Sequence, residues 1–138
     1  MRLGLALLPL SMLAQPAIAA APAAVDGLWK TEDGKAMVRI GTCGEGLCGT
    51  VAKLLAPPSE GDGFDVRNPD QALRARPLIG MPILTGFKPE SGQWRGKIYD
   101  PKTGKTYRSI LKRENANMLQ VQGCVAFFCQ TQHWQRAG

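Results

Sequence analysis

The stretch I-G-T-C-G-E-G-L-C-G, residues Ile40 to Gly49, places four glycines and two cysteines within ten positions. A phosphate-binding loop would need Lys-Ser/Thr after its glycines and a helix behind them. Instead Thr50–Leu55 follows, which is more typical of a strand. A zinc site would need more closely spaced cysteines or added histidines, and the chain has one histidine, His133. The glycines therefore predict a tight hairpin turn between two strands.

The first residues indicate the compartment in which this hairpin folds. A basic start at Arg2 precedes the apolar run Leu3–Leu13, and Ala17-Ile18-Ala19 has the small-x-small pattern of a cleavage site. We expect residues 1–19 to be a signal peptide, cut after Ala19, and residues 20–138 to form one domain that is ordered from about residue 26. The apolar run is shorter than the roughly 20 residues that a spanning helix needs. We therefore expect a periplasmic or secreted protein with no transmembrane segment.

The four cysteines form two pairs with the same spacing. Cys43 and Cys48 have four residues between them, and so have Cys124 and Cys129. In an oxidising compartment such cysteines predict disulfides. Opposed residues of antiparallel strands lie at a distance that suits a disulfide, so we expect Cys43–Cys48 and Cys124–Cys129, each joining the strands of its own hairpin. The crossed pairings stay open, because sequence does not determine connectivity.

Period-two alternation and short turns recur along the rest of the chain. They predict an all-β fold, an eight-stranded antiparallel up-and-down barrel whose closure removes the exposed edges; a flattened, partly open barrel or sandwich is the alternative. One short helix is expected in the longest loop, with Asn68 as N-cap, Pro69 in the first turn and Pro77 ending it. The expected strands are Gly27–Thr31, Ala36–Thr42, Leu47–Leu55, Pro82–Phe87, Gln93–Tyr99, Lys105–Lys112, Asn117–Gln122 and Gln130–Arg136.

Several stretches together resemble one known family. They are G-L-W-K-T at Gly27–Thr31, L-C-G at Leu47–Gly49, R-N-P-D-Q-A-L-R-A-R-P-L-I-G at Arg67–Gly80, I-L-T-G-F at Ile83–Phe87, W-R-G-K-I-Y-D-P-K-T-G-K-T-Y at Trp94–Tyr107 and T-Q-H-W-Q-R at Thr131–Arg136. In this order they resemble the uncharacterised secreted bacterial proteins of domain of unknown function 2147. The resemblance covers nearly all of the chain after residue 19 and implies a lipocalin-like (calycin) barrel. It implies no established activity.

A looser similarity to calycin barrels concerns the two ends of the domain. Such barrels often carry Gly-x-Trp on the first strand and an Arg from the last strand across that Trp. Trp29 and Arg136 occupy these places here. We expect a cation–π contact between them that closes one end of the barrel and has a structural role.

Patterns of known catalytic and metal sites are mostly missing from the sequence. There is no G-x-S-x-G, H-E-x-x-H or strand-linked G-x-G-x-x-G motif. The one histidine, His133, alternates with Trp134 and should face the other way, so a multi-histidine metal centre is not expected. Oxidised cysteines provide no thiolate nucleophile. We therefore expect no enzyme, no metal site and no cofactor.

The charge of the chain bears on its partners. The formal net charge is +6, and the basic residues are spread rather than clustered. An exported basic protein can meet anionic ligands, lipids or glycans, whereas no motif for nucleic acid is present. We expect no nucleic-acid partner, and the sequence does not predict the oligomeric state.

Two groups of residues are candidates for a binding site. One group surrounds the expected helix, as a lid that either braces the barrel through ion pairs or presents arginines to an anionic headgroup. The other lines the barrel, where Gln132, Trp134 and Arg136 share one face of the last strand. The candidates are Arg67, Asn68, Arg74, Arg76, Tyr99, Tyr107, Gln132 and Trp134.

Two functions of different classes follow from these candidates. The first is an exported binding module for a small apolar or amphipathic, anionic ligand, held in a small cavity of the kind that an eight-stranded barrel allows. The second is a non-catalytic protein of the cell envelope, with a filled barrel and a basic surface that docks on anionic glycan, lipid or a protein. A cavity inside the barrel would distinguish them.

Overall fold

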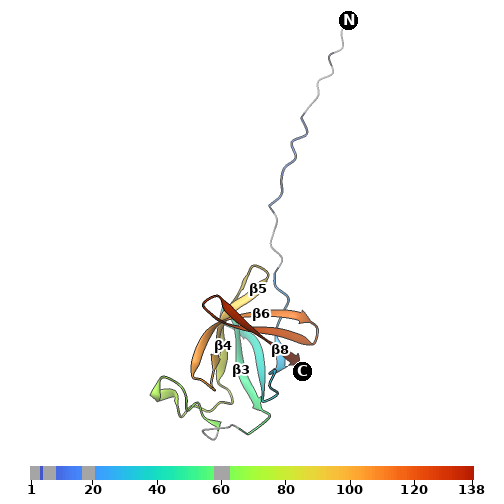
Figure 1. The fold of residues 1–138 in the computed structure, drawn as a ribbon. Coiled ribbons are helices and arrows are strands. Elements are labelled where there is room, and N and C mark those ends of the chain that lie inside the picture. Colours follow the sequence, from blue (N-terminus) through green and yellow to red (C-terminus); the bar gives the residue numbers. More distant parts are fainter. Residues whose placement is uncertain (1–3, 5–8, 17–20, 58–62) are drawn as a thin grey trace.

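The computed structural model describes residues 4, 9–16, 21–57 and 63–138. The expected cleavage motif at residues 17–19 lies outside the described residues. Eight strands and the 3-10 turn η2 follow in the order β1 Gly27–Lys30, β2 Ala36–Cys43, β3 Gly46–Leu54, η2 Gln71–Leu73, β4 Pro82–Glu90, β5 Gln93–Asp100, β6 Lys105–Asn115, β7 Met118–Val125 and β8 Phe128–Arg136 (Figure 1).

The eight strands form a closed antiparallel barrel in which each strand pairs with the next along the chain. The barrel closes where β1 pairs with β8, through the partners Trp29↔Arg136 and Lys30↔Gln135. The predicted up-and-down barrel is therefore confirmed, and the open sandwich is not adopted. The closing seam is short because β1 is only 4 residues long, whereas β8 has 9.

Three hairpins extend further than the sequence indicated. The expected turn at Lys88–Gly92 is wrong in its first half, because β4 continues through Pro89 to Glu90 and only Ser91 and Gly92 turn, both with positive φ. Such two-residue turns match the twist of the paired strands, so pairing continues up to the turn itself. In the same way β6 continues to Asn115, β7 continues to Val125, and β8 already begins at Phe128.

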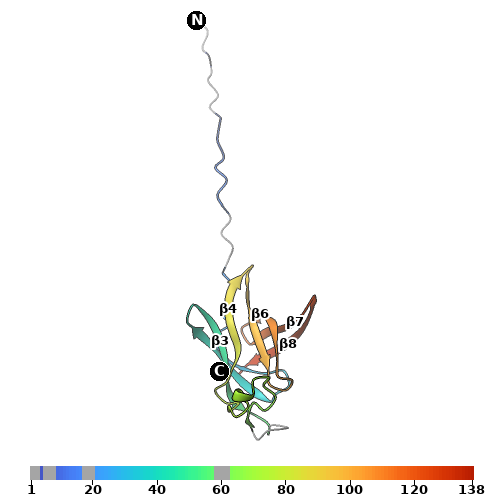
Figure 2. The same cartoon turned by 90° about the vertical axis from the view of Figure 1, so that its left-hand side faces the viewer.

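The expected helix is shorter and begins later than predicted. It is a single 3-10 turn, Gln71–Leu73, and its N-cap is Asp70, whose side chain accepts a hydrogen bond from the Ala72 N–H at 3.0 Å. Asn68 does not cap it, because its carboxamide oxygen accepts the Asp70 N–H and its amide donates to Asp65. The green segment in Figures 1 and 2 shows this turn in the loop between β3 and β4.

Both predicted disulfides are present, but their geometry differs. Cys124 and Cys129 are directly opposed across β7 and β8, with a Cα–Cα distance of 4.0 Å. Cys43 and Cys48 are not directly opposed: Cys43 pairs with Gly46 and Cys48 with Gly41, so this disulfide joins the strands diagonally over 5.5 Å. The expectation of direct opposition is therefore wrong for this hairpin. The tight two-residue turn places the cysteines out of register.

One end of the barrel is closed by its own side chains. Trp29 is fully buried, and its Nε1 donates to the Val25 carbonyl at 2.9 Å. The Arg136 guanidinium lies 4.9 Å from the Trp29 ring centroid, the contact expected from the sequence, and Arg113 lies 5.9 Å from it. Packing on the barrel begins at Ala23, before residue 26, because the Ala23 carbonyl accepts a hydrogen bond from a tryptophan of β5.

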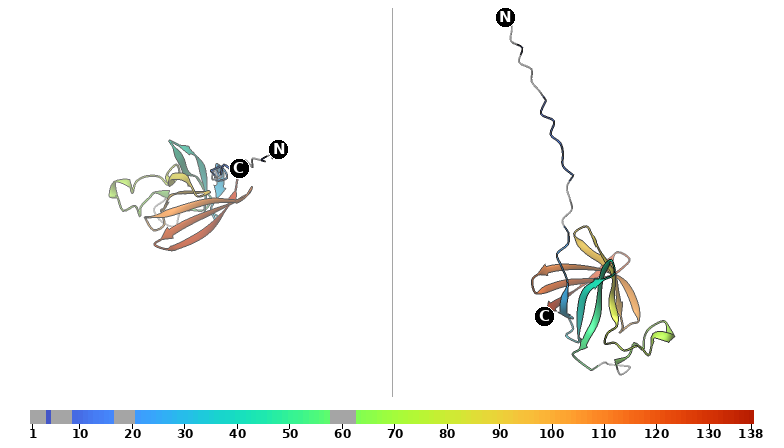
Figure 3. Two further views of the ribbon diagram at one scale, coloured as in Figure 1. Left: turned by 90° about the horizontal axis from the view of Figure 1, so that it is seen from above. Right: turned by 180° about the vertical axis from the view of Figure 1, so that it is seen from behind.

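The two termini of the domain lie side by side at this closed end (Figure 3). The Leu28 N–H donates to the Gly138 carbonyl, and the Ala137 N–H donates to the Leu28 carbonyl. In an up-and-down barrel alternate connections lie at opposite ends. The β1–β2, β5–β6 and β7–β8 turns and the long loop 55–81 therefore surround the other, open end, which the green loop marks in Figure 2.

Candidate functional site

A cavity of about 550 Å³ enters the barrel from its open end. Inward-facing residues of the strands form its wall, and the surrounding turns and loop form its mouth. Its volume lies within the roughly 300–1,000 Å³ that is typical of small-molecule sites. Most of its inner wall is apolar, with contributions from Val51, Ile83, Ile98, Val121 and Trp134, and β8 adds the polar side chains Gln130 and Gln132.

Five of the eight candidate residues meet in this cavity. For Gln132 and Trp134 alternation along β8 explains why, since every second residue of a barrel strand faces inward. Trp134 on β8 is 2 % exposed, and its Nε1 donates to the Gln132 side-chain oxygen at 3.0 Å. The indole nitrogen is thus satisfied by a neighbour on the same strand face. The five lining candidates are Arg67, Tyr99, Tyr107, Gln132 and Trp134.

Asn68, Arg74 and Arg76 do not line the cavity. Arg76 forms an ion pair with Asp65, with 3.0 Å between its Nη2 and Oδ2, and Asn68 Nδ2 donates to the same oxygen at 2.8 Å. Arg74 Nε donates to the Asn68 carbonyl at 2.8 Å. These three side chains hold the loop in shape, so the bracing alternative describes them better than ligand contact does.

Asp65 is the centre of this brace. Its side chain is fully buried, and besides Asn68 and Arg76 it accepts a 2.6 Å hydrogen bond from the Tyr99 hydroxyl. Burial raises the pKa of Tyr99 to about 12, together with this hydrogen bond and the charge of Asp65. Tyr99 therefore presents its ring to the cavity while its hydroxyl is occupied. The sequence candidates omitted Asp65, because its partner on β5 is distant along the chain.

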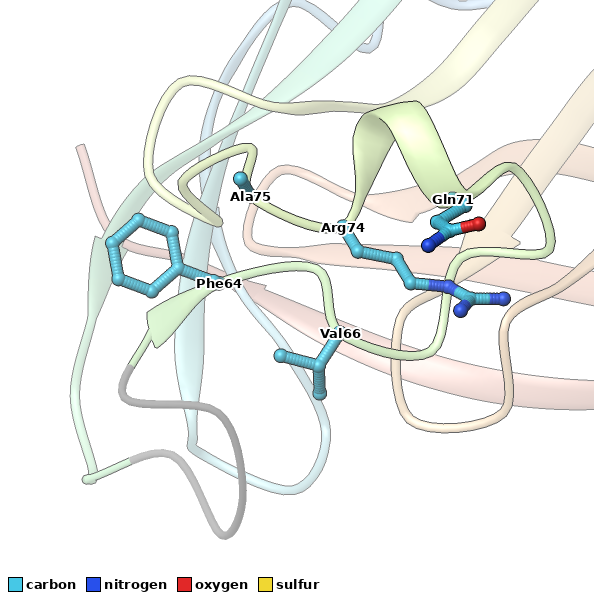
Figure 4. A pocket seen from close by; sticks show the side chains of 5 residues that line it. All are labelled: Phe64, Val66, Gln71, Arg74 and Ala75. Carbon is cyan, nitrogen blue, oxygen red and sulfur yellow. The ribbon is translucent and has the colours of Figure 1, made fainter.

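A second, shallow pocket lies within the loop between β3 and β4. Figure 4 shows its residues, with the Arg74 side chain directed toward Gln71 and with Phe64 and Val66 on an adjacent segment of the loop. Its lining comes only from residues of this loop, namely Phe64, Val66, Gln71, Arg74 and Ala75. A pocket built from one loop offers few convergent polar groups, so the barrel cavity is the better candidate site.

Charged side chains gather at the mouth of the cavity. Lys102 Nζ donates to the Asp33 carboxylate at 2.5 Å and joins the β5–β6 turn to the β1–β2 turn. Burial alone would raise the pKa of Asp33, but hydrogen bonds from Lys102, the Lys35 N–H and the Thr31 hydroxyl outweigh burial and lower it to about 2. Asp33 is therefore ionised at neutral pH and holds the two turns together.

His133 lies outside the cavity. It is exposed, as expected for a residue that faces away from Trp134, and its Nε2 is 3.7 Å from a carboxylate oxygen of Glu114. Within the described ranges, no three His, Cys, Asp or Glu side chains are close enough together to hold a metal ion. No helix in the described part of the chain is long and apolar enough to cross a membrane.

Comparison with known proteins places the chain in a family. The sequence profile of an uncharacterised protein family conserved in bacteria, DUF2147, matches residues 27–136. Protein HP1028 from Helicobacter pylori, described as a member of the lipocalin family, superposes with a TM-score of 0.71 at 20 % sequence identity, covering 83 % of this chain and 84 % of that one. No curated protein is similar enough in sequence to count as a match. The chain therefore belongs to the DUF2147 family of bacterial proteins, and its fold is a lipocalin-like barrel.

Proposed function

We propose that the protein is an exported, non-catalytic binding module that holds a small amphipathic anion in its barrel. The observation that carries the proposal is the cavity of about 550 Å³, whose inner wall is mostly apolar. Its mouth contains three basic residues, Lys35, Arg67 and Lys102, against the two acidic residues Asp33 and Asp100. An apolar tail would bury its surface against the wall, while an anionic headgroup would lie among the basic side chains at the mouth. The lipocalin-like fold supports a binding role.

Two disulfides support the exported state, since such bonds persist in oxidising compartments. The alternative, an envelope protein with a filled barrel, fits less well with a cavity of this size. Its basic docking surface does not depend on a filled barrel and is compatible with a binding module.

The experiment is a displacement titration with a fluorescent fatty-acid probe, followed by native mass spectrometry without detergent. Gly123 lines the cavity on β7, and a Cβ added there would meet only the Ile98 side chain, at 3.8 Å. Gly123→Leu should fill part of the cavity and weaken probe binding by about tenfold or more without loss of stability. Gln122→Leu, one residue along on the opposite face of β7, is the matched control and should bind normally.

A second pair of variants tests the charge of the ligand. Lys35→Gln at the mouth should weaken binding of a fatty acid by about fivefold but leave the matching fatty alcohol unchanged. Lys53→Gln, an exposed lysine on β3 that does not line the cavity, is the control. If neither probe binds, or if Gly123→Leu binds as well as the unmodified protein, the proposal is wrong.

A further inference from the structure

The tip of the β7–β8 hairpin presents three large apolar side chains to solvent. Phe127 is 100 % exposed, Phe128 81 % and Val125 59 %. Scattered exposed apolar residues are normal on protein surfaces, but a contiguous group marks an interaction site. Nothing in the described part of the barrel covers this tip.

The hairpin holds these side chains in a fixed position. The Cys124–Cys129 disulfide joins the two strands directly below the tip. The Arg108 guanidinium on the neighbouring strand β6 donates to the Ala126 carbonyl in the turn. Ala126 itself has φ 51°, a left-handed conformation that costs a non-glycine residue energy. The turn is thus held by contacts on two sides, and both phenylalanines remain largely exposed to solvent.

The tip lies at the mouth of the cavity. Val125 and Phe128 line the cavity wall, and the loop contributes Phe64 and Val66, which are 43 % and 39 % exposed. Two elements that are far apart in the sequence therefore present apolar side chains at the same opening. The apolar surface is continuous with the proposed binding site.

Basic side chains predominate around this opening. Among the described residues that line the opening, Lys35, Arg67 and Lys102 are basic and Asp33 and Asp100 are acidic, and Arg108 adds a further basic side chain beside the hairpin turn. The Asp33 carboxylate pairs with Lys102, and the Asp100 carboxylate accepts hydrogen bonds within its own turn. Exposed aromatic side chains flanked by positive charge are typical of segments that bind the interface of anionic membranes.

A second copy of the chain fits this tip less well. A stable protein interface buries about 800 Å² on each partner, whereas two phenylalanine side chains supply roughly 300–500 Å². The tip of a two-residue turn is also convex and offers no groove for a partner. A lipid bilayer needs no shape complementarity, because its headgroup region accommodates whatever enters it.

We propose that the β7–β8 tip docks on an anionic lipid bilayer. Phe127 and Phe128 enter the headgroup region, and Arg108 and Lys35 contact lipid phosphates. Docking in this way brings the mouth of the cavity to the lipid surface. It does not require a ligand in the cavity, so it can hold whether or not the proposed binding function does.

Vesicle co-sedimentation of the full domain tests the docking. We expect binding to vesicles of phosphatidylcholine with phosphatidylglycerol, weaker binding as salt is added, and little binding to phosphatidylcholine alone. The double variant Phe127→Ser/Phe128→Ser should lower the partition coefficient by about tenfold or more. Leu73→Ser/Ile79→Ser, which removes two other exposed apolar side chains of the loop, is the control and should bind normally.

Arg108 provides a separate test of charge. Arg108→Gln should weaken binding to the anionic vesicles by about fivefold, and Arg108→Lys should restore most of it. Gly123→Leu, which fills the cavity, should bind vesicles normally, so failure of the cavity proposal and failure of docking are distinguishable. Unfolding midpoints establish that each variant is folded.

Three results would overturn the docking proposal. The first is no binding to anionic vesicles at low salt. The second is equal loss of binding in the Phe127/Phe128 and Leu73/Ile79 variants. The third is a dimer in sedimentation equilibrium that the Phe127/Phe128 variant dissociates, which would assign the tip to a second copy of the chain.

Discussion

The Tyr99 hydroxyl donates a 2.6 Å hydrogen bond to the Asp65 carboxylate, and this bond ties the longest loop of the barrel to strand β5. Asp65 is fully buried, so its charge needs partners. The loop itself supplies Asn68 and Arg76, and the barrel supplies Tyr99. The loop at the mouth of the cavity is therefore held by one buried anion, and its position depends on that charge.

Asp65→Asn should destabilise the protein strongly. The substitution keeps the size of the side chain but removes the charge opposite Arg76 and leaves an amide facing the Asn68 amide. Breaking a buried pair costs about 3–5 kcal/mol, and because the Arg76 side chain is 32 % exposed we expect about 2–4 kcal/mol here. Urea unfolding measures the loss. Asp70→Asn is the control, since asparagine also caps a helical turn, and it should be nearly neutral; equal losses would contradict a special role for Asp65.

The same bond predicts how stability depends on alkaline pH. The pKa of Tyr99 rises from 10.0 to about 12 on folding, so folding favours the protonated hydroxyl. This contribution to stability is fully present below pH 10 and is lost as pH rises toward about 12. Tyr99→Phe should lower stability at neutral pH and flatten the decline above pH 10, as followed by urea midpoints across that range. Tyr107→Phe leaves the Tyr99–Asp65 pair intact and serves as control; an unchanged decline in Tyr99→Phe would refute the assignment.

Much of the fold could be predicted from local patterns. Period-two alternation and turn residues located all eight strands, and equal cysteine spacing predicted both disulfides. Turn boundaries were less accurate, because Lys88-Pro89-Glu90 has turn composition and yet pairs as strand. That pairing depends on the two-residue turn beyond it, which composition alone does not reveal.

The sequence could predict which residues line the cavity only where they lie on strands, because the alternation of a strand defines the direction of each side chain. Alternation along β8 places Gln132 and Trp134 on one inward face, and both line the cavity. A loop has no such period, so nothing in the sequence distinguished Arg67, which lines the cavity, from Arg76, which pairs with Asp65. The contacts that decide between these roles join residues far apart along the chain.

The two arginines over Trp29 offer a matched comparison at the closed end. Arg113 and Arg136 each donate three hydrogen bonds to backbone carbonyls. Arg136 lies closer to the ring, at 4.9 Å against 5.9 Å. Arg136→Met should therefore destabilise the barrel more than Arg113→Met, by about 1 kcal/mol. Thermal and urea unfolding of both variants measure the difference, and equal losses would show that the cation–π contact adds little to the backbone hydrogen bonds.

Alanine substitutions of Gly104 and Gly34, two glycines in turns at the open end, distinguish the cost of backbone strain from the cost of a steric clash. Both glycines have left-handed backbones, with φ 72° and 71°. A Cβ on Gly34 would meet nothing within 4 Å, whereas a Cβ on Gly104 would lie 1.9 Å from the Arg67 carbonyl oxygen. Gly34→Ala should cost about 1–2 kcal/mol from strain alone, and Gly104→Ala should cost about 3 kcal/mol or more, because the loop must also move.

The position of the loop gives the Gly104 comparison a second measurement. Amide chemical shifts of residues 65–76 should change in Gly104→Ala and stay as in the unmodified protein in Gly34→Ala. The Tyr99–Asp65 hydrogen bond holds the loop against the barrel, and the Arg67 backbone of the loop packs against Gly104 in the β5–β6 turn. Displacing the loop at Gly104 should therefore weaken ligand binding at the mouth as well as stability. If both alanine variants lose the same stability and the amide chemical shifts of the loop do not change, the loop moves without an energetic cost and does not define the mouth of the cavity.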